Sequence, residues 1–217
     1  MENDVKEFLS ELLKQLKSID YIKPEDIPNI DLYMDQVTTF MDEQLAASKR
    51  YESDKILTKT MINNYAKNNL LPSPDKKKYS KEHVLTLLFI YYFKNILSIN
   101  DIRSILNPLT EKYFGNDDGF TMQDVYTEVF SLEAEESQKL LKDLGKKYKI
   151  AGETFEDFPD EDQKFLHTFS FICMLSFDVY IKKMLIERMI DNLNGEKEAS
   201  SHENTHSGKE SKKTGSN

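Results

Sequence analysis

The strongest constraint in this sequence is a stretch that has almost no polar side. Residues 81–96 read KEHVLTLLFIYYFKNI, and their apolar members fall on nearly every side of a helix. A helix of this kind is buried at the centre of a domain or covered by a partner. Ser80 is expected to be its N-cap, and His83 at the third helical position predicts that the full capping box is absent. The other helices must therefore pack around this one.

A shorter helix is expected before it, at about residues 59–68. Thr58 is its expected N-cap, and Met61, Ile62 and Tyr65 have the spacing of an inward face. The side chains expected on the outward face are polar: Lys59, Thr60, Asn63, Asn64 and Lys67. Such side chains suit contacts with phosphates and base edges. A solvated helix face is the plainer alternative, and the neighbouring basic turn favours the first interpretation.

That basic turn lies between the two helices. Asn69 fits the left-handed position after a helix, and Pro72 and Pro74 keep the helix from continuing. The four residues that follow, Asp75, Lys76, Lys77 and Lys78, predict a tight basic turn, and Tyr79 is expected to pack inward.

Charge is distributed unevenly along the 217 residues, whose net charge is −9. Residues 49–82 contain nine Lys or Arg and four Asp or Glu, which gives +5 and leaves −14 for the rest. A basic patch on an acidic body is a pattern suited to directed phosphate contacts, because the body repels nucleic acid elsewhere.

Further helices are expected on both sides of this segment. Residues 4–19 have the apolar spacing of an amphipathic helix, and Asp31 is the expected N-cap of a helix that extends to about residue 48. Ser98 is expected to cap a short helix that ends before Pro108. We place the first helix in a segment of its own, residues 1–25, ahead of a helical domain over residues 26–115.

The C-terminal part is predicted to be helical over residues 116–193, followed by a disordered tail over residues 194–217. Its last helix, about residues 161–193, contains the most apolar window of the chain. Asp178, Lys182 and Lys183 interrupt this window, so a membrane span is disfavoured. We expect residues 165–189 either to form a dimer seam or to close the core of the monomer.

The sequence offers no pattern of catalytic chemistry. It has no glycine-rich phosphate loop, no nucleophile elbow and no paired-histidine zinc helix, so we expect neither an enzyme nor a cofactor or metal. Residues 116–119, NDDG, lack the ligand spacing of a calcium loop and predict a plain turn. The single cysteine, Cys173, excludes a disulfide framework and favours the reducing cytoplasm. The first residues, MENDVKEF, do not resemble a secretory signal.

Several of these features recur together in a known module. They are a helix that ends in Leu70, Leu71 and Pro72, a short basic turn, the pair Tyr79 and Ser80, and the sequence LSINDI from Leu97 after the apolar helix. In this order they resemble the winged helix-turn-helix of MerR-type transcription regulators. More closely, DLYMDQV, LTKTMINNYAKNNLLP, KKKYSKEHV and LSINDI resemble the domain of unknown function DUF1836 over about residues 26–115.

The resemblance implies an all-α fold, with a MerR-like winged helix-turn-helix and additional N- and C-terminal helices. Residues 58–67 would be the recognition helix, the helix from Asp31 its scaffold, and the lysine turn the wing. The implied DNA-binding residues are Lys59, Thr60, Asn63, Asn64, Tyr65, Lys67, Lys76, Lys77 and Lys78. The chain departs from the MerR pattern where KRYESD separates the two helices, and where Thr60 and Asn63 replace common arginines.

The expected function is therefore a DNA-binding transcription regulator that contacts double-stranded DNA, with a homodimer through its C-terminal helix as one of the two roles open to that helix. The alternative is a non-enzymatic protein-interaction adaptor on the same scaffold, which the acidic body and the lack of arginine favour. A membrane-associated role is third. No small-molecule effector is identifiable from the sequence.

Overall fold

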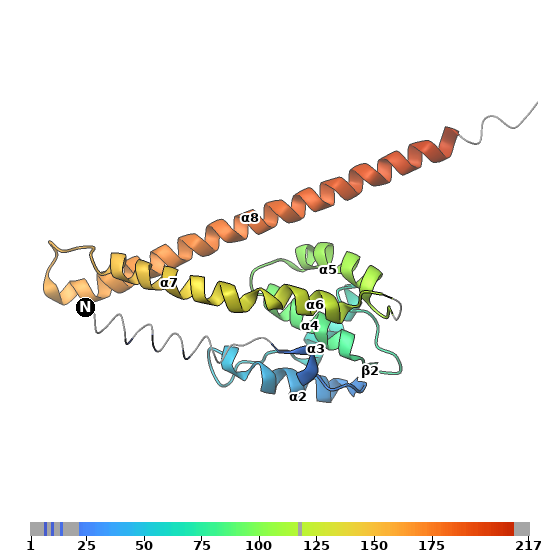
Figure 1. The fold of residues 1–217 in the computed structure, drawn as a ribbon, viewed down its shortest axis with the longest axis horizontal. Coiled ribbons are helices and arrows are strands. Elements are labelled where there is room, and N and C mark those ends of the chain that lie inside the picture. Colours follow the sequence, from blue (N-terminus) through green and yellow to red (C-terminus); the bar gives the residue numbers. More distant parts are fainter. Residues whose placement is uncertain (1–6, 8–9, 11–13, 15–21, 117–118, 211–217) are drawn as a thin grey trace, which may run out of the picture.

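The computed structural model describes residues 7, 10, 14, 22–116 and 119–210 (Figure 1). The predicted N-terminal helix, residues 4–19, lies almost wholly outside these ranges. The helices are α2 (Met34–Gln44), α3 (Lys59–Lys67), α4 (Lys81–Phe93), α5 (Ile99–Tyr113), α6 (Met122–Ser131), α7 (Glu133–Ala151) and α8 (Asp160–Glu210). Two short strands, β1 (Leu32–Tyr33) and β2 (Lys78–Tyr79), form the sheet of the described chain. The prediction of a mostly helical fold is confirmed.

Helix α4 is the centre of the core, as its composition predicted. Every residue from 83 to 91 is buried, and α5, α6 and β2 pack around it. Its N-terminus corrects one expectation, because the capping box is complete. The Ser80 backbone N–H donates to Nδ1 of His83 at 3.0 Å, so the imidazole takes the place of the usual glutamate. The helix ends at Phe93, where a turn begins that leads to Leu97.

The start of α2 corrects a second expectation. Leu32 and Tyr33 pair with Tyr79 and Lys78 in an antiparallel register, so they are extended and Asp31 does not cap the helix. Helix α2 begins at Met34, and its first turn is closed by the backbone N–H of Tyr33, which donates to the Gln36 side chain at 2.8 Å. The ladder with β2 satisfies backbone groups that a longer helix would otherwise have used.

Helix α5 begins as predicted and ends later than predicted. Ser98 is its N-cap, because the backbone N–H of Asp101 donates to Ser98 Oγ at 3.2 Å. The helix continues through Pro108 to Tyr113. A proline removes one helical donor, but the helix packs against the core on both sides of it: Ile102 and Leu106 are buried before Pro108, and Leu109 and Tyr113 pack on the core after it.

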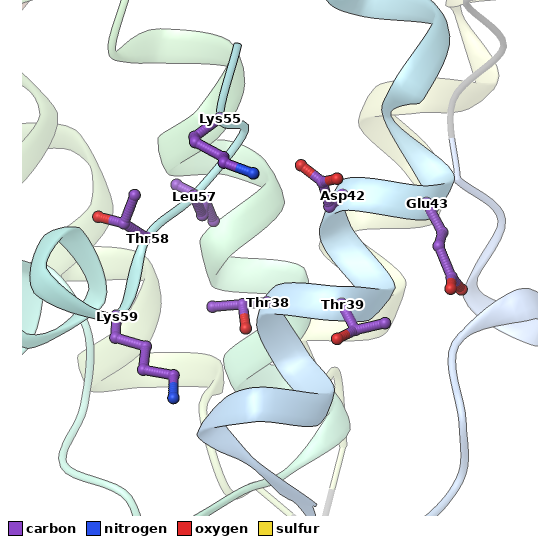
Figure 2. A pocket seen from close by; sticks show the side chains of 8 residues that line it. All are labelled: Thr38, Thr39, Asp42, Glu43, Lys55, Leu57, Thr58 and Lys59. Carbon is purple, nitrogen blue, oxygen red and sulfur yellow. The ribbon is translucent and has the colours of Figure 1, made fainter. Parts of the chain in front are cut away.

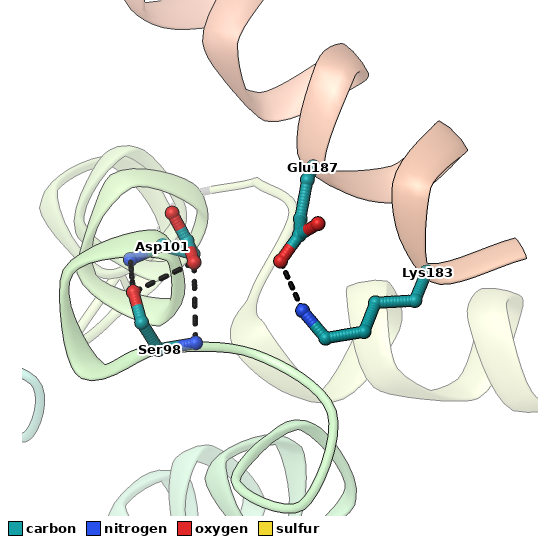
Figure 3. A network of polar contacts seen from close by, with 4 residues as sticks. All are labelled: Ser98, Asp101, Lys183 and Glu187. Carbon is teal, nitrogen blue, oxygen red and sulfur yellow. Dashed lines mark hydrogen bonds and ion pairs between the residues drawn. The ribbon is translucent and has the colours of Figure 1, made fainter. Parts of the chain in front are cut away.

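The C-terminal helices form a long hairpin. α7 and α8 lie antiparallel near their connection. There the ring centroids of Tyr148 and Phe171 are 5.4 Å apart, and Lys147 forms an ion pair with Asp178. Farther along, the two helices diverge, and α8 crosses α5 before it extends beyond the body (Figure 1). Near this crossing, the Ser98 cap faces the intrahelical pair of Lys183 and Glu187 (Figure 3).

Helix α8 is longer than the sequence indicated. It continues to Glu210, whereas we expected a disordered tail from residue 194, and residues 211–217 lie outside the described ranges. No proline follows residue 193 to end the helix. None of the helices in the described ranges is long and apolar enough to span a membrane.

Candidate nucleic-acid interface

The basic turn is a short hairpin, residues 75–78, which is closed by an isolated bridge between Asp75 and Lys78 and leads directly into β2. The backbone N–H of Lys78 donates to the carbonyl of Asp75 at 2.7 Å. Lys76 and Lys77 lie between them with positive φ angles, 46° and 65°, and both are exposed. This is the geometry of a type I′ turn, which asparagine and glycine adopt far more easily than lysine. The chain therefore presents two lysines at a strained tip.

The polar face of α3 is exposed as expected. The backbone N–H of Met61 donates to Thr58 Oγ1 at 3.2 Å, which confirms Thr58 as the N-cap. Ile62 is buried, and Asn69 adopts the left-handed conformation with φ 55°. The outward side chains all reach solvent: Lys59, Thr60, Asn63, Asn64 and Lys67. The helix thus separates its two faces in the way that the spacing predicted.

Tyr65 does not belong to the exposed set. Its side chain is only 7% exposed and lies in the core, where burial raises the pKa of its hydroxyl above the ordinary value. Its carbonyl accepts from the backbone N–H of Leu70 at 2.9 Å, which turns the chain back into the core. The expectation that Tyr65 stands at a DNA surface is corrected, because its position on α3 is the inward one.

Two lysines of the candidate site already have partners. Lys59 forms an ion pair with Asp35 of α2, and both side chains are mostly exposed. Nζ of Lys78 lies 5.5 Å from the ring centroid of Tyr33 on the paired strand. Exposed pairs of this kind contribute little to stability, so a phosphate can replace the carboxylate at modest cost. Lys76 and Lys77 form no ion pair within the described part of the chain.

A cavity of about 400 Å³ lies between α2 and the start of α3 (Figure 2). Its walls carry Asp42 and Glu43 from α2, with Lys55 and Lys59 from the other side. The hydrogen bond from Lys49 to Asp42, at 2.8 Å, lowers the pKa of that carboxyl, so Asp42 keeps its charge. A groove of mixed charge does not suit a polyanion. The hairpin tip and the outer face of α3 are the more favourable surfaces.

The segment between α2 and α3 is held by the C-terminal end of α4. Nζ of Lys94 donates to the carbonyl of Ile56 at 2.6 Å and lies 4.9 Å from the ring centroid of Tyr91. Burial lowers the pKa of Lys94. The hydroxyl of Tyr91 also bonds to Ser48. The residues that separate the two helices are thereby anchored to the core, and sequence reasoning missed Lys94 because its partner is a backbone carbonyl.

The ring of His83 packs edge to face against Tyr79 and Phe114. Its centroid lies 5.5 Å from the ring centroid of Tyr79 and 4.7 Å from that of Phe114. Burial lowers the pKa of this imidazole and is the largest effect on it. The carbonyls of Ser73 and Pro72 and the negative charge of Asp31 raise the pKa, but by less. Although the carbonyls of Ser73 and Pro72 favour the protonated ring, none of the described residues forms a hydrogen bond of normal geometry with Nε2. The neutral ring accepts the Ser80 N–H, so the cap of α4 depends on its protonation state.

Residues 22–129 match the family model described as Domain of unknown function (DUF1836). The match runs from the segment before β1 into α6 and includes both strands, the α2–α3 pair and the central helix. No curated protein and no solved structure gives a match. The resemblance found over residues 26–115 is thus confirmed at the level of the family.

Proposed function

We propose that the DUF1836 domain of this chain, residues 22–129, is a DNA-binding module of the MerR-like winged helix-turn-helix kind, and that the protein is a transcription regulator. In this proposal α2 is the scaffold helix, α3 is the recognition helix and the turn at residues 75–78 is the wing. The ligand is double-stranded DNA, contacted through lysine and amide side chains.

The observation that carries the proposal is the conformation of Lys76 and Lys77. Both have positive φ and both are exposed at the hairpin tip. A left-handed conformation costs a lysine on the order of 1 kcal/mol, and strained residues of this kind gather at functional sites. Local folding alone favours asparagine and glycine here. Phosphate binding gives a reason for two positive charges at this point.

The distribution of charge supports the same conclusion. Residues 49–82 carry +5 in a chain of net charge −9. Thr60, Asn63 and Asn64 add exposed hydrogen-bonding groups on α3 that suit base edges or phosphates. Since Lys59 is paired with Asp35, we expect it to contribute less than the two lysines at the tip.

A titration of fluorescent duplex DNA at two salt concentrations tests the proposal, with random duplexes compared against DNA from upstream of the gene. The K76E/K77E variant should lose most of the affinity. A matched control, K142E/K146E, makes the same charge change on exposed lysines of α7. Its affinity for DNA should stay much closer to that of the native chain. Lack of binding by the native chain at low salt, or binding without a salt slope, would contradict the proposal.

The second candidate is a protein-interaction adaptor on the same scaffold. It is favoured by the acidic remainder of the chain and by the exposed apolar side chains of α8. A partner retained in a pull-down after nuclease treatment, and retained equally by K76E/K77E, would favour the adaptor over the regulator.

A further inference from the structure

The small sheet carries one aromatic ring on its outward face. In β1 the side chains alternate, so Leu32 is buried at 5% exposure and Tyr33 faces solvent at 55%. In β2 the alternation is the same, with Tyr79 buried and Lys78 turned toward the outward side. Because Tyr33 pairs with Lys78 across the two strands, the two side chains are neighbours on one face of the sheet.

The ring of Tyr33 and the ammonium of Lys78 are already in contact. Nζ of Lys78 lies 5.5 Å from the ring centroid, within the range of a cation–π interaction. Lys78 is half-buried, whereas Lys76 and Lys77 at the hairpin tip are exposed. The ring and the partial burial together restrict where the charge of Lys78 lies, so the pair is organised before a ligand arrives.

We propose that Tyr33 packs against a deoxyribose of duplex DNA while Lys78 binds the phosphate joined to that sugar. This contact rests on the proposed DNA binding, and it adds the part of the duplex that the sheet touches. Every nucleotide carries the same sugar, so the contact contributes affinity and orientation without a preference for sequence.

The chemistry of the DNA backbone matches this pair of side chains. A lysine ammonium binds a phosphate as a point charge. The sugar bonded to that phosphate presents C–H groups, which suit the negative face of an aromatic ring. A phosphate held by Lys78 therefore brings a sugar close to Tyr33. Stacking on a base would need a base that has left the duplex, whereas the sugars are accessible along an intact double helix.

A second pair of the same kind provides a matched control. The guanidinium of Arg50 lies 5.2 Å from the ring centroid of Tyr51, whose side chain is 59% exposed. This pair belongs to the segment between α2 and α3 and is not part of the sheet. Loss of the Tyr51 ring thus removes a similar area of exposed aromatic surface without touching the proposed contact.

Anisotropy titration of a fluorescent duplex at several salt concentrations tests the contact. Y33A should lower the affinity about fivefold at each salt concentration, because it removes ring surface that a sugar would cover and no charge. Its slope of log affinity against log salt should stay at the native value, whereas K78Q should reduce the slope by about 0.9. Y33F keeps the ring and should bind as the native chain does, and so should Y51A. The loss in Y33A should be equal for random and upstream duplexes.

Native affinity in Y33A, or an equal loss in Y51A, would overturn the sugar contact and leave the proposed DNA binding intact. An equal loss in Y33F would assign the contact to the hydroxyl, and a loss confined to one duplex would assign it to a base; either result also overturns it. A native chain that binds no DNA at low salt contradicts both proposals. Circular dichroism checks that each variant is folded. Y33T, whose branched side chain suits a strand, is a second ring-free variant and should show the same loss.

Discussion

Replacing Lys76 by asparagine and Lys77 by glycine should stabilise the fold and weaken DNA binding at the same time. Both lysines have positive φ angles, 46° and 65°, in a two-residue turn whose preferred residues are asparagine and glycine. The substitution keeps the backbone path and removes two exposed charges. Few surface changes are expected to move stability and binding in opposite directions, so the pair of results is informative.

The stability gain follows from the backbone. Each left-handed lysine costs on the order of 1 kcal/mol, so relief at two positions gives about 2 kcal/mol. Glycine offsets about half of this, because it gains more freedom in the unfolded chain. A net gain of about 1 kcal/mol should raise the Tm by about 2–4 °C in a chain of this size.

The binding loss follows from counterion release. If each lysine neutralises one phosphate, the slope of log affinity against log salt should fall by about 0.9 for each lysine. Thermal unfolding by circular dichroism and anisotropy titration at several salt concentrations measure the two effects. The K142Q/K146Q variant removes two exposed charges from α7 and should leave the slope nearly unchanged. An unchanged or lower Tm would refute the argument from strain, and an unchanged slope with a raised Tm would refute the wing as a contact.

Three further outcomes follow from side chains that are buried or half-buried. Since the pKa of His83 lies below its ordinary value of 6.5, the folded chain should lose stability as the pH falls below about 6.5. The H83Q variant can keep an acceptor for the Ser80 N–H, so the free energy of unfolding, measured in urea, should depend less on pH in this variant. Lys94→Met leaves the carbonyl of Ile56 without its donor and should cost about 1–2 kcal/mol in the free energy of unfolding, with DNA affinity falling if α3 shifts. Tyr65→Phe should leave DNA affinity unchanged in an anisotropy titration because the ring is buried; a large loss would restore this residue to the interface.

Local patterns predicted the elements whose causes are local. The caps at Thr58 and Ser98, the left-handed Asn69 and the buried course of α4 each depend on residues within one or two helical turns. Tyr65 shows how a resemblance can mislead, since its own spacing on α3 already indicated the inward face.

Features that depend on distant partners could not be predicted in the same way. β1 is only two residues long, so it shows no alternation of apolar and polar residues that would predict a strand. It exists because β2, which follows α3 in the chain, pairs with it. Helix α5 continues through Pro108 because Leu106 before it and Leu109 after it both pack on the core, which is a tertiary effect. The divergence of α7 and α8, which leaves so much apolar surface uncovered, is a property of the arrangement and not of either helix (Figure 1).

The pairing of β1 with β2 also constrains how the domain forms. Leu32 and Tyr79 are neighbours in the sheet, and all of α2 and α3 lies between them in the chain. Such a contact closes a long loop, and its entropy must be lost before the contact gives any stabilisation. The sheet should therefore form late, on a core that α4 has already organised. Amide protons of Leu32 and Tyr79 would then exchange in the same opening event, so the hairpin and the start of α2 would loosen together.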